Sequence, residues 1–403
     1  MKWPSKTVWI CFFIHTFIVF TSYLLADKLP YHDPAGFIDQ SLYPMSPYIE
    51  KLIKWDAHWY TYIAAHGYDS QSIVFFPAII VLIKVISALG IHVAVAGLVI
   101  CNLFAFLSFW ILYLTFKLDF SEKEVKYALL SYAVMPTSFF LNSIYTEPIF
   151  IASALACVYY ARIGKWWYAG LAGALATLTR NLGIFLFLFL IYEFIQTYPI
   201  LVQCRKNLTT AESSIQGKIF NPSYFDSKII KLPDCAKGAI FPLLLPLAAL
   251  LLFMSYNLYL LGDPLTFISS QQGWGRHLGW PWQNIWNNLP LTFANNPVNQ
   301  PGVTLDTFTV IISLVGLLCT TFLPKFKVRK SYLIIGWLWF IIPLAFSATE
   351  LPLYSMSRFV LPIFPLYLFF ARLPKKIFYC YIAISATTLL LCTSLFINWY
   401  WIG

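Results

Sequence analysis

The stretch from Val93 to Phe116, VAVAGLVICNLFAFLSFWILYLTF, decides the fold class because none of its 24 residues is charged and most are apolar. A helix of about 20 predominantly apolar residues can cross the hydrocarbon core of a bilayer. Similar runs recur along the chain, whose 403 residues are 59% hydrophobic and only 11% charged. Soluble domains are about half apolar and a quarter charged. The sequence therefore predicts an all-α fold, a polytopic transmembrane helix bundle.

Apolar runs separated by charged breaks divide the chain into about eleven predicted spans. In residue numbers these are 8–26, 93–116, 127–143, 148–161, 166–179, 182–198, 238–261, 305–323, 331–348, 359–371 and 377–398. The first run is expected to remain as an anchor, because no small-residue cleavage site follows it. We expect residues 1–403 to form a single membrane domain, with the polar stretch 199–237 as a cytoplasmic linker loop.

The distribution of positive charge sets the orientation of these spans. Of the 27 lysines and arginines, which give the chain a net charge of +10, all but seven fall in segments on one side. The exceptions are Lys28, Lys51, Lys54, Lys84, Arg180, Arg276 and Arg358. A span at 75–89 would invert every later loop, so this run is predicted to be interfacial, within an outer loop at 27–92 that holds interfacial helices. The positive charge thus follows the positive-inside rule, and the basic clusters beside the spans contact membrane lipids. A nucleic-acid partner is therefore excluded as the reason for the charge.

Nothing in the sequence predicts a cofactor or a metal centre. The eight cysteines show no zinc-type spacing, and none falls in an outer loop, where a disulfide framework would form. His58 and His66, with Asp69 nearby, invite a metal interpretation, but the two histidines lie eight residues apart. Metal ligands on a helix are usually spaced by three or four residues. Hydrogen-bonding roles therefore fit the two histidines better.

One acid stands among aromatic side chains in the first outer loop, in the run Lys54-Trp55-Asp56-Ala57-His58-Trp59-Tyr60. The apolar period predicts a helix over 51–65 with Asp56 at its rim. Aromatic neighbours partly desolvate the carboxylate, which favours a role as a general base. The alternative is a solvated acid or an ion-pair partner of Lys51 or Lys54.

Four more charged residues fall near the predicted outer ends of helices. Glu147 precedes Pro148 at the outer end of two spans, and it is a candidate functional acid or, alternatively, a helix N-cap. Arg180, Arg276 and Arg358 are outer-side cations. A fixed guanidinium is well suited to hold a phosphate, whereas the alternative is an anchor whose charged head reaches the interface.

Several of these residues belong to local patterns spread in order along the chain. The patterns are Trp55-Asp56, Ile63-Ala64, His66-Gly67-Tyr68, Phe75-Phe76-Pro77, Pro136, Phe140, Tyr145-Thr146-Glu147, Phe150, Thr179-Arg180-Asn181, Gly183, Arg358-Phe359, Pro362 and Phe364-Pro365. They resemble the GPI mannosyltransferase II (PIG-V) family, well over residues 50–185 and loosely in the C-terminal half. The resemblance implies a GT-C type membrane glycosyltransferase.

This resemblance also implies the chemistry. Such enzymes use a polyprenyl-phosphate sugar donor at the outer or lumenal face and invert the anomeric centre, and eukaryotic members add the second mannose of the GPI anchor. The acid that the family treats as catalytic corresponds to Asp56. The chain is compact, like the prokaryotic relatives, so a bacterial plasma membrane is expected, with the endoplasmic reticulum as the alternative. The expected acceptor is a lipid-linked molecule or a glycan. The sequence leaves open whether a partner subunit is needed.

We therefore expect Asp56 and Glu147 to be catalytic. The expected substrate-binding residues are Trp55, His58, Trp59, Tyr60, His66, Arg180, Gln272, Arg276 and Arg358. Arg358, with Arg180 or Arg276, would hold the donor phosphate. One alternative is a membrane transporter or lipid flippase, although the chain shows no paired half-repeats of the transporter type. Another is a non-catalytic subunit that stabilises a different enzyme.

Overall fold

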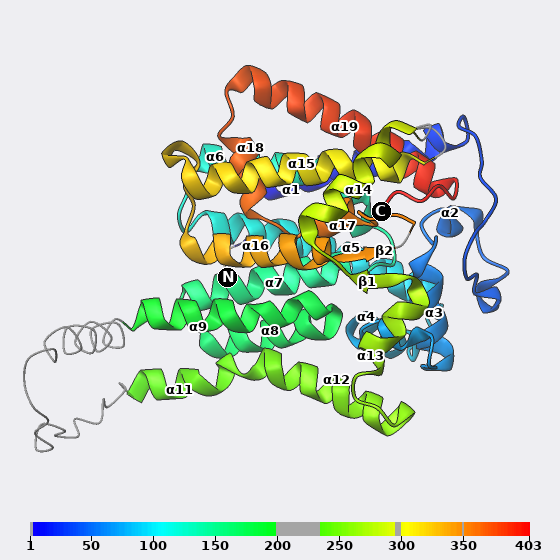
Figure 1. The fold of residues 1–403 in the computed structure, drawn as a ribbon, viewed down its shortest axis with the longest axis horizontal. Helices are drawn as coiled ribbons and strands as arrows, with labels where there is room; N and C mark the ends of the chain where they lie inside the picture. Colours follow the sequence, from blue (N-terminus) through cyan, green and yellow to red (C-terminus); the bar gives the residue numbers. More distant parts are fainter. Residues whose placement is uncertain (1–2, 199–233, 295–299, 349) are drawn as a thin grey trace, which may run out of the picture.

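Long helices lie side by side across the molecule in the computed structural model, which describes residues 3–198, 234–294, 300–348 and 350–403 (Figure 1). The helices are α1 (Lys6–Ala26), α2 (Pro47–Glu50), α3 (Asp56–His66), α4 (Pro77–Ser87), α5 (Val93–Phe116), α6 (Glu122–Ala133), α7 (Glu147–Arg162), α8 (Trp166–Thr179), α9 (Leu186–Thr197), α11 (Asp234–Leu243), α12 (Leu245–Leu261), α13 (Thr266–Ser269), α14 (Pro281–Ala294), α15 (Pro301–Phe322), α16 (Lys330–Ala345), α17 (Met356–Val360), α18 (Pro365–Ala371) and α19 (Lys375–Ile397). Short 3₁₀ turns are η1 (Gln40–Leu42), η2 (Ser72–Val74), η3 (Ser138–Leu141), η4 (Asn181–Phe185), η7 (Ser270–Trp274) and η8 (Pro324–Phe326). Within the described ranges, one two-stranded ribbon, β1 (Arg276–Leu278) and β2 (Phe346–Ala348), is the only sheet. The prediction of an all-α membrane protein is confirmed in this coarse sense.

Four helices of the described chain are long and apolar enough to cross a membrane: α1, α5, α15 and α19. A fifth span would be the pair Leu245–Leu261 and Thr266–Trp274, which is bent by 86°. The predicted bounds 93–116 and 166–179 agree with α5 and α8. The count of about eleven spans stays a prediction, because other predicted spans form shorter helices, such as α7 with 16 residues. The predicted linker 199–237 lies outside the described residues up to residue 233, and its last residues begin α11.

A proline pair divides the predicted span 238–261 into α11 and α12. Pro246 has no N–H to donate to the carbonyl of Pro242 four residues earlier, so the helix is interrupted between them. α8 packs against both halves. A Cβ atom at Gly170 of α8 would clash with the Pro242 carbonyl, so only glycine allows this close approach. Helix packing is therefore tightest where the backbone ladder is broken.

Besides the four-residue α2, two helices of 11 residues each, α3 and α4, form in the predicted first outer loop, where interfacial helices were predicted. The helix predicted over 51–65 begins later, at Asp56, because Trp55 has a φ of 55°, outside the helical range. The run 75–89 forms α4 with 11 residues, which is too short to cross a bilayer. The position of both helices at the membrane interface stays a prediction.

The two strands and the short helices α2, α3 and α13 lie at one end of the bundle (Figure 1). There β1 pairs antiparallel with β2, with Arg276 opposite Ala348. β1 and α14 lie in the stretch 262–304, for which the sequence predicts only a loop. A three-residue strand is too short to show alternation. In α14 the polar residues Asn284 and Asn288 are the buried ones, so the usual apolar period that predicts a helix is inverted.

Charged side chains join the helices at the opposite end. Glu193 of α9 is buried and accepts hydrogen bonds from Arg329 Nε at 2.8 Å and Nη2 at 2.9 Å. Arg162, at the end of α7, donates from Nη2 to Asp119 Oδ1 at 2.8 Å. A buried carboxylate that is paired in this way is stabilised by its hydrogen bonds. These pairs have a structural role. The candidate site lies at the other end of the bundle.

Candidate active site

A cavity of about 650 Å³ opens where the short elements gather. Ligand sites typically have volumes of about 300–1,000 Å³. The ionisable side chains that line it are Asp56, Tyr60, Arg180, Arg276, Glu350, Tyr354 and Arg358. They come from α3, the end of α8, β1, the segment between β2 and α17, and α17 itself. Parts of the chain that are distant in sequence therefore converge on one site.

Asp56 is the first residue of α3 and lines the cavity with a side chain that is 19% exposed. Its Oδ2 accepts a hydrogen bond from Arg358 Nη1 at 2.9 Å, and no other side chain of the described residues bonds this carboxylate. A helix N-terminus stabilises negative charge at this position. The alternative that Asp56 pairs with Lys51 or Lys54 is wrong, because both lysines pair with other acids.

Glu147 joins two of the arginines from behind the cavity wall. It is fully buried, its Oε1 accepts a hydrogen bond from Arg180 Nη1, and the same oxygen lies 3.3 Å from Arg358 Nε. Glu147 does not line the cavity. Glu147 thus contacts the two guanidinium groups and not the cavity, and its catalytic role stays a prediction. The N-cap alternative is wrong, because Thr146 is the cap and Glu147 is already helical.

Three guanidinium groups surround one aromatic ring of the cavity wall. The Cζ atoms of Arg180, Arg276 and Arg358 lie 4.7, 5.6 and 5.7 Å from the centre of the Phe359 ring. Arg180 and Arg358 are paired with acids, whereas Arg276 has no acidic partner in the part of the chain that the structure describes. Burial, with a smaller contribution from the Arg358 cation, lowers the pKa of Arg276 to about 10, so it stays charged at neutral pH. An unpaired cation beside a cavity is suited to bind an anion.

A buried carboxylate that the sequence analysis overlooked fixes the position of Arg358. Asp306 of α15 accepts hydrogen bonds from the backbone N–H of Ser357 at 2.7 Å and of Ser355 at 3.1 Å. Ser355 has a φ of 67°, which residues other than glycine rarely adopt, so the two bonds hold an otherwise disfavoured turn. This turn starts α17, and the break between α17 and α18 at residues 361–364 splits the predicted span 359–371. The clue in the sequence was an acid inside an otherwise apolar helix.

Five of the expected substrate-binding residues do not line the cavity. They are Trp55, His58, Trp59, His66 and Gln272. α3 presents only one side to the cavity, with Asp56 and Tyr60 one turn apart, so the residues between them point elsewhere. Trp59 stacks on Phe37 instead. Gln272 is exposed, and its neighbour Gln271 lines the cavity in its place.

Both histidines of α3 hydrogen-bond to the backbone. His58 is buried, and its Nδ1 accepts from the Asp39 N–H at 3.3 Å. His66 is exposed, and its Nδ1 lies 3.1 Å from the Tyr62 carbonyl oxygen. Among the described residues no group of three or more histidine, cysteine or acidic side chains could hold a metal ion. The geometry therefore assigns the pair to hydrogen bonding, as expected.

We expect the protein to lose stability as the pH falls from about 6.5 to about 4. Burial, and to a smaller degree the Lys54 cation, lowers the pKa of His58 to about 4, against about 6.5 in the unfolded chain. Between these values only the unfolded chain binds the proton, so stability rises with pH and the gain is complete above about 6.5, on the order of 3 kcal/mol. Thermal unfolding against pH measures this slope. His58→Gln should flatten it and His66→Gln should not; a slope that survives in His58→Gln assigns it to other groups.

The helical membrane bundle and its charged cavity together define a membrane-embedded enzyme. Residues 9–217 match the family described as mannosyltransferase (PIG-V). The chain belongs to this family, and it is a glycosyltransferase of the mannosyltransferase type. No curated protein matches it. The matched residues include Asp56, Glu147 and Arg180, whereas Arg276 and Arg358 lie beyond them. This family describes an enzyme, so it does not support the transporter and partner-subunit alternatives.

Proposed function

We propose that the protein transfers mannose from a polyprenyl-phosphate donor to a hydroxyl group of a lipid-linked or glycan acceptor, with inversion at the anomeric carbon. The reaction takes place at the outer or lumenal face of a membrane. In a prokaryote this membrane is the plasma membrane. The observation that carries this proposal is that Asp56, one of the two acids lining the cavity with Glu350, shares it with three guanidinium groups. The charged groups supply a proton acceptor and an anion site in the same cavity.

The donor phosphate binds to the arginines. Arg276 lacks an acidic partner among the described residues, so a phosphate that enters replaces no existing ion pair there. Arg180 and Arg358 are held in place by Glu147. Fixed guanidinium groups that need no rearrangement stabilise charge as it develops on the leaving phosphate.

Asp56 accepts the proton of the acceptor. The acceptor oxygen attacks the anomeric carbon, the bond from that carbon to the phosphate oxygen breaks, and the phosphate leaves with the electron pair. The hydroxyl proton passes to the carboxylate oxygen of Asp56 that Arg358 does not occupy. Attack from the side opposite the leaving group gives inversion. Asp56 and Arg276 lie on different elements, α3 and β1, whereas Arg358 contacts Asp56 directly.

An apolar wall of the same cavity suits the lipid chain of the donor. Leu250, Ile268, Ile342 and Phe346 line it, and Ile268 and Phe346 are also exposed on the surface of the protein. Exposed apolar side chains that continue into a cavity give a lipid chain a path from the bilayer to the arginines. A water-soluble donor would gain nothing from this wall.

The proposal is tested by incubating the purified protein in nanodiscs with labelled polyprenyl-phosphate mannose, polyprenyl-phosphate glucose or a nucleotide-activated mannose. We expect transfer from polyprenyl-phosphate mannose, with mass spectrometry identifying the product and NMR showing the inverted anomer. Transfer from the nucleotide sugar, or a product that retains the donor configuration, would contradict the proposal.

Asp306→Asn should reduce the transfer rate by about 10- to 100-fold, because the amide nitrogen cannot accept the second backbone hydrogen bond and Arg358 shifts from its position. Steady-state kinetics measure the effect, with Asp263→Asn, a change at an exposed acid, as the control. Wild-type kinetics in Asp306→Asn would show that the turn at Ser355 holds without the carboxylate.

A further inference from the structure

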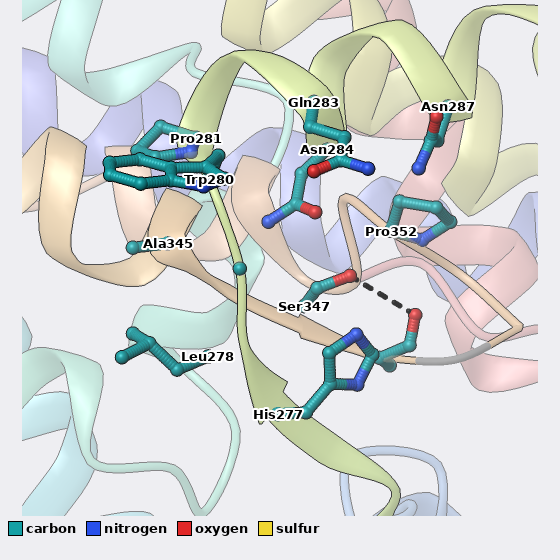
Figure 2. Close-up of a pocket in the computed structure, with 12 residues that line it drawn as sticks. His277, Leu278, Trp280, Pro281, Gln283, Asn284, Asn287, Ala345, Ser347 and Pro352 are labelled. Carbon is teal, nitrogen blue, oxygen red and sulfur yellow. Dashed lines mark hydrogen bonds between the residues drawn. The ribbon is translucent and has the colours of Figure 1, made fainter.

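A second cavity of about 720 Å³ lies beside the first, across the β1–β2 ribbon (Figure 2). Ala348 lines both cavities, while Arg276 lines the first and its neighbour His277 lines the second. The ribbon therefore borders both cavities, with Arg276 on the side of the first and His277 and Leu278 on the side of the second. A ligand longer than one sugar ring could therefore occupy both.

The second cavity is lined by apolar and by uncharged polar residues. None of its lining residues is an acid, a lysine or an arginine. Figure 2 shows Gln283, Asn284 and Asn287 on α14 above Ser347 and His277 of the ribbon. The absence of cations among these residues makes the cavity a poor site for a phosphate, which fits the arginines of the first cavity instead.

The amides of this cavity have hydrogen-bonding capacity to spare. Asn284 is fixed because its Nδ2 donates to the Leu344 carbonyl at 2.8 Å, but its Oδ1 accepts no hydrogen bond from the described residues. The side chains of Gln283 and Asn287 make no hydrogen bond within the described part of the chain. Amides offer both donors and acceptors, which is what a ligand rich in hydroxyl groups requires.

Two tryptophans stand at the edge of the cavity. Trp280 lines it, and the Trp280 and Trp282 rings stack with centroids 4.8 Å apart and an interplanar angle of 22°. Their side chains are 63% and 65% exposed. Aromatic faces beside amides give the combination of an apolar surface and hydroxyl-binding groups that a sugar ring matches.

We propose that the second cavity binds the uncharged carbohydrate part of the acceptor, beyond the hydroxyl group that receives mannose. This assignment rests on the proposed function, because it needs an acceptor that already carries sugar. The ribbon then sets the distance between the bound sugars and Asp56. The competing interpretation is that the exposed tryptophans of this region lie in membrane lipid.

Binding of methyl α-mannotrioside, an uncharged trisaccharide, tests the proposal without turnover. The protein in nanodiscs is titrated with the trisaccharide, in the absence of donor, and saturation-transfer NMR gives the Kd. We expect Trp280→Ala and Asn287→Ala each to weaken binding by about tenfold. The matched control is Trp286→Ala, which removes an exposed tryptophan of α14 that does not line the cavity, and it should change the Kd by less than about twofold.

Three outcomes would overturn the assignment: no saturable binding, equal weakening by Trp280→Ala and Trp286→Ala, or quenching of Trp280 fluorescence by brominated lipids that the trisaccharide does not relieve. The last outcome would assign the region to lipid contact. Asp56→Asn separates this proposal from the proposed function, since it should bind the trisaccharide like the wild type. Intact trisaccharide binding in a wild-type protein that transfers no mannose would contradict the proposed function alone.

Discussion

Asp56→Asn is expected to reduce the transfer rate by about 10²–10⁴-fold, the usual contribution of a positioned general base. Asparagine has nearly the same shape, and its amide oxygen can still accept the hydrogen bond from Arg358 Nη1. The substitution removes the proton acceptor and little else. Donor affinity should therefore change far less than kcat.

The matched control is Asp69→Asn, a change in the same loop. Asp69 is exposed, and its carboxylate accepts hydrogen bonds from the backbone N–H of Gln71 and Ser72 without lining the cavity. It should keep wild-type kinetics. Initial rates against donor and acceptor concentration, with purified protein in nanodiscs, measure both variants. Asp56→Asn protein that transfers mannose at the wild-type rate would remove Asp56 as the base.

The helices were predictable wherever an apolar run is uninterrupted. The run 93–116 has no charge and no proline, and α5 has those bounds. The run 238–261 is as apolar, but its pattern does not reveal that Pro242 and Pro246 break the hydrogen-bond ladder at one point. The sequence did not predict α14, because Asn284 and Asn288 face the protein interior while the tryptophans of this helix are exposed. Periodicity predicts where a helix lies but not which side of it the fold will bury.

The charge pattern predicts that the key side chains lie on one side of the membrane, but it could not pair them. Asp56 and Arg358 are 302 residues apart in sequence, and only the folded chain brings them to 2.9 Å. The residues around Asp56 were predicted as a group because they share a motif. The structure separates them, since α3 starts at Asp56 and turns His58 and Trp59 into the core. Motif membership therefore predicted an acid that lines the cavity, together with neighbours that do not.

Arg358→Ala is expected to weaken donor binding and to lower kcat by about 10²–10³-fold, the effect of removing one preorganised group that stabilises charge in the transition state. Arg358 is the one described residue that contacts both Asp56 and Glu147. Its loss removes a cation from the phosphate site and frees the proton acceptor from its position. Kinetics against donor concentration separate the two effects as KM and kcat. Arg372→Ala, at an arginine paired with Glu124, is the matched control and should be neutral.

The same substitution leaves Glu147 with one partner fewer in a fully buried place, so folding and catalysis could fail together. A second variant distinguishes them. Arg358→Ala combined with Glu147→Gln removes one negative charge together with the positive charge, and the amide oxygen of the glutamine can still accept the hydrogen bond from Arg180. Its thermal unfolding temperature should therefore return toward that of the wild type, while the transfer rate stays low because the Arg358 guanidinium no longer faces the phosphate. If the double variant recovers both stability and rate, the cavity does not need Arg358 for chemistry, and the phosphate site must be built from Arg180 and Arg276 alone. If Arg358→Ala folds well and its KM for the donor is unchanged, the phosphate role of Arg358 is wrong.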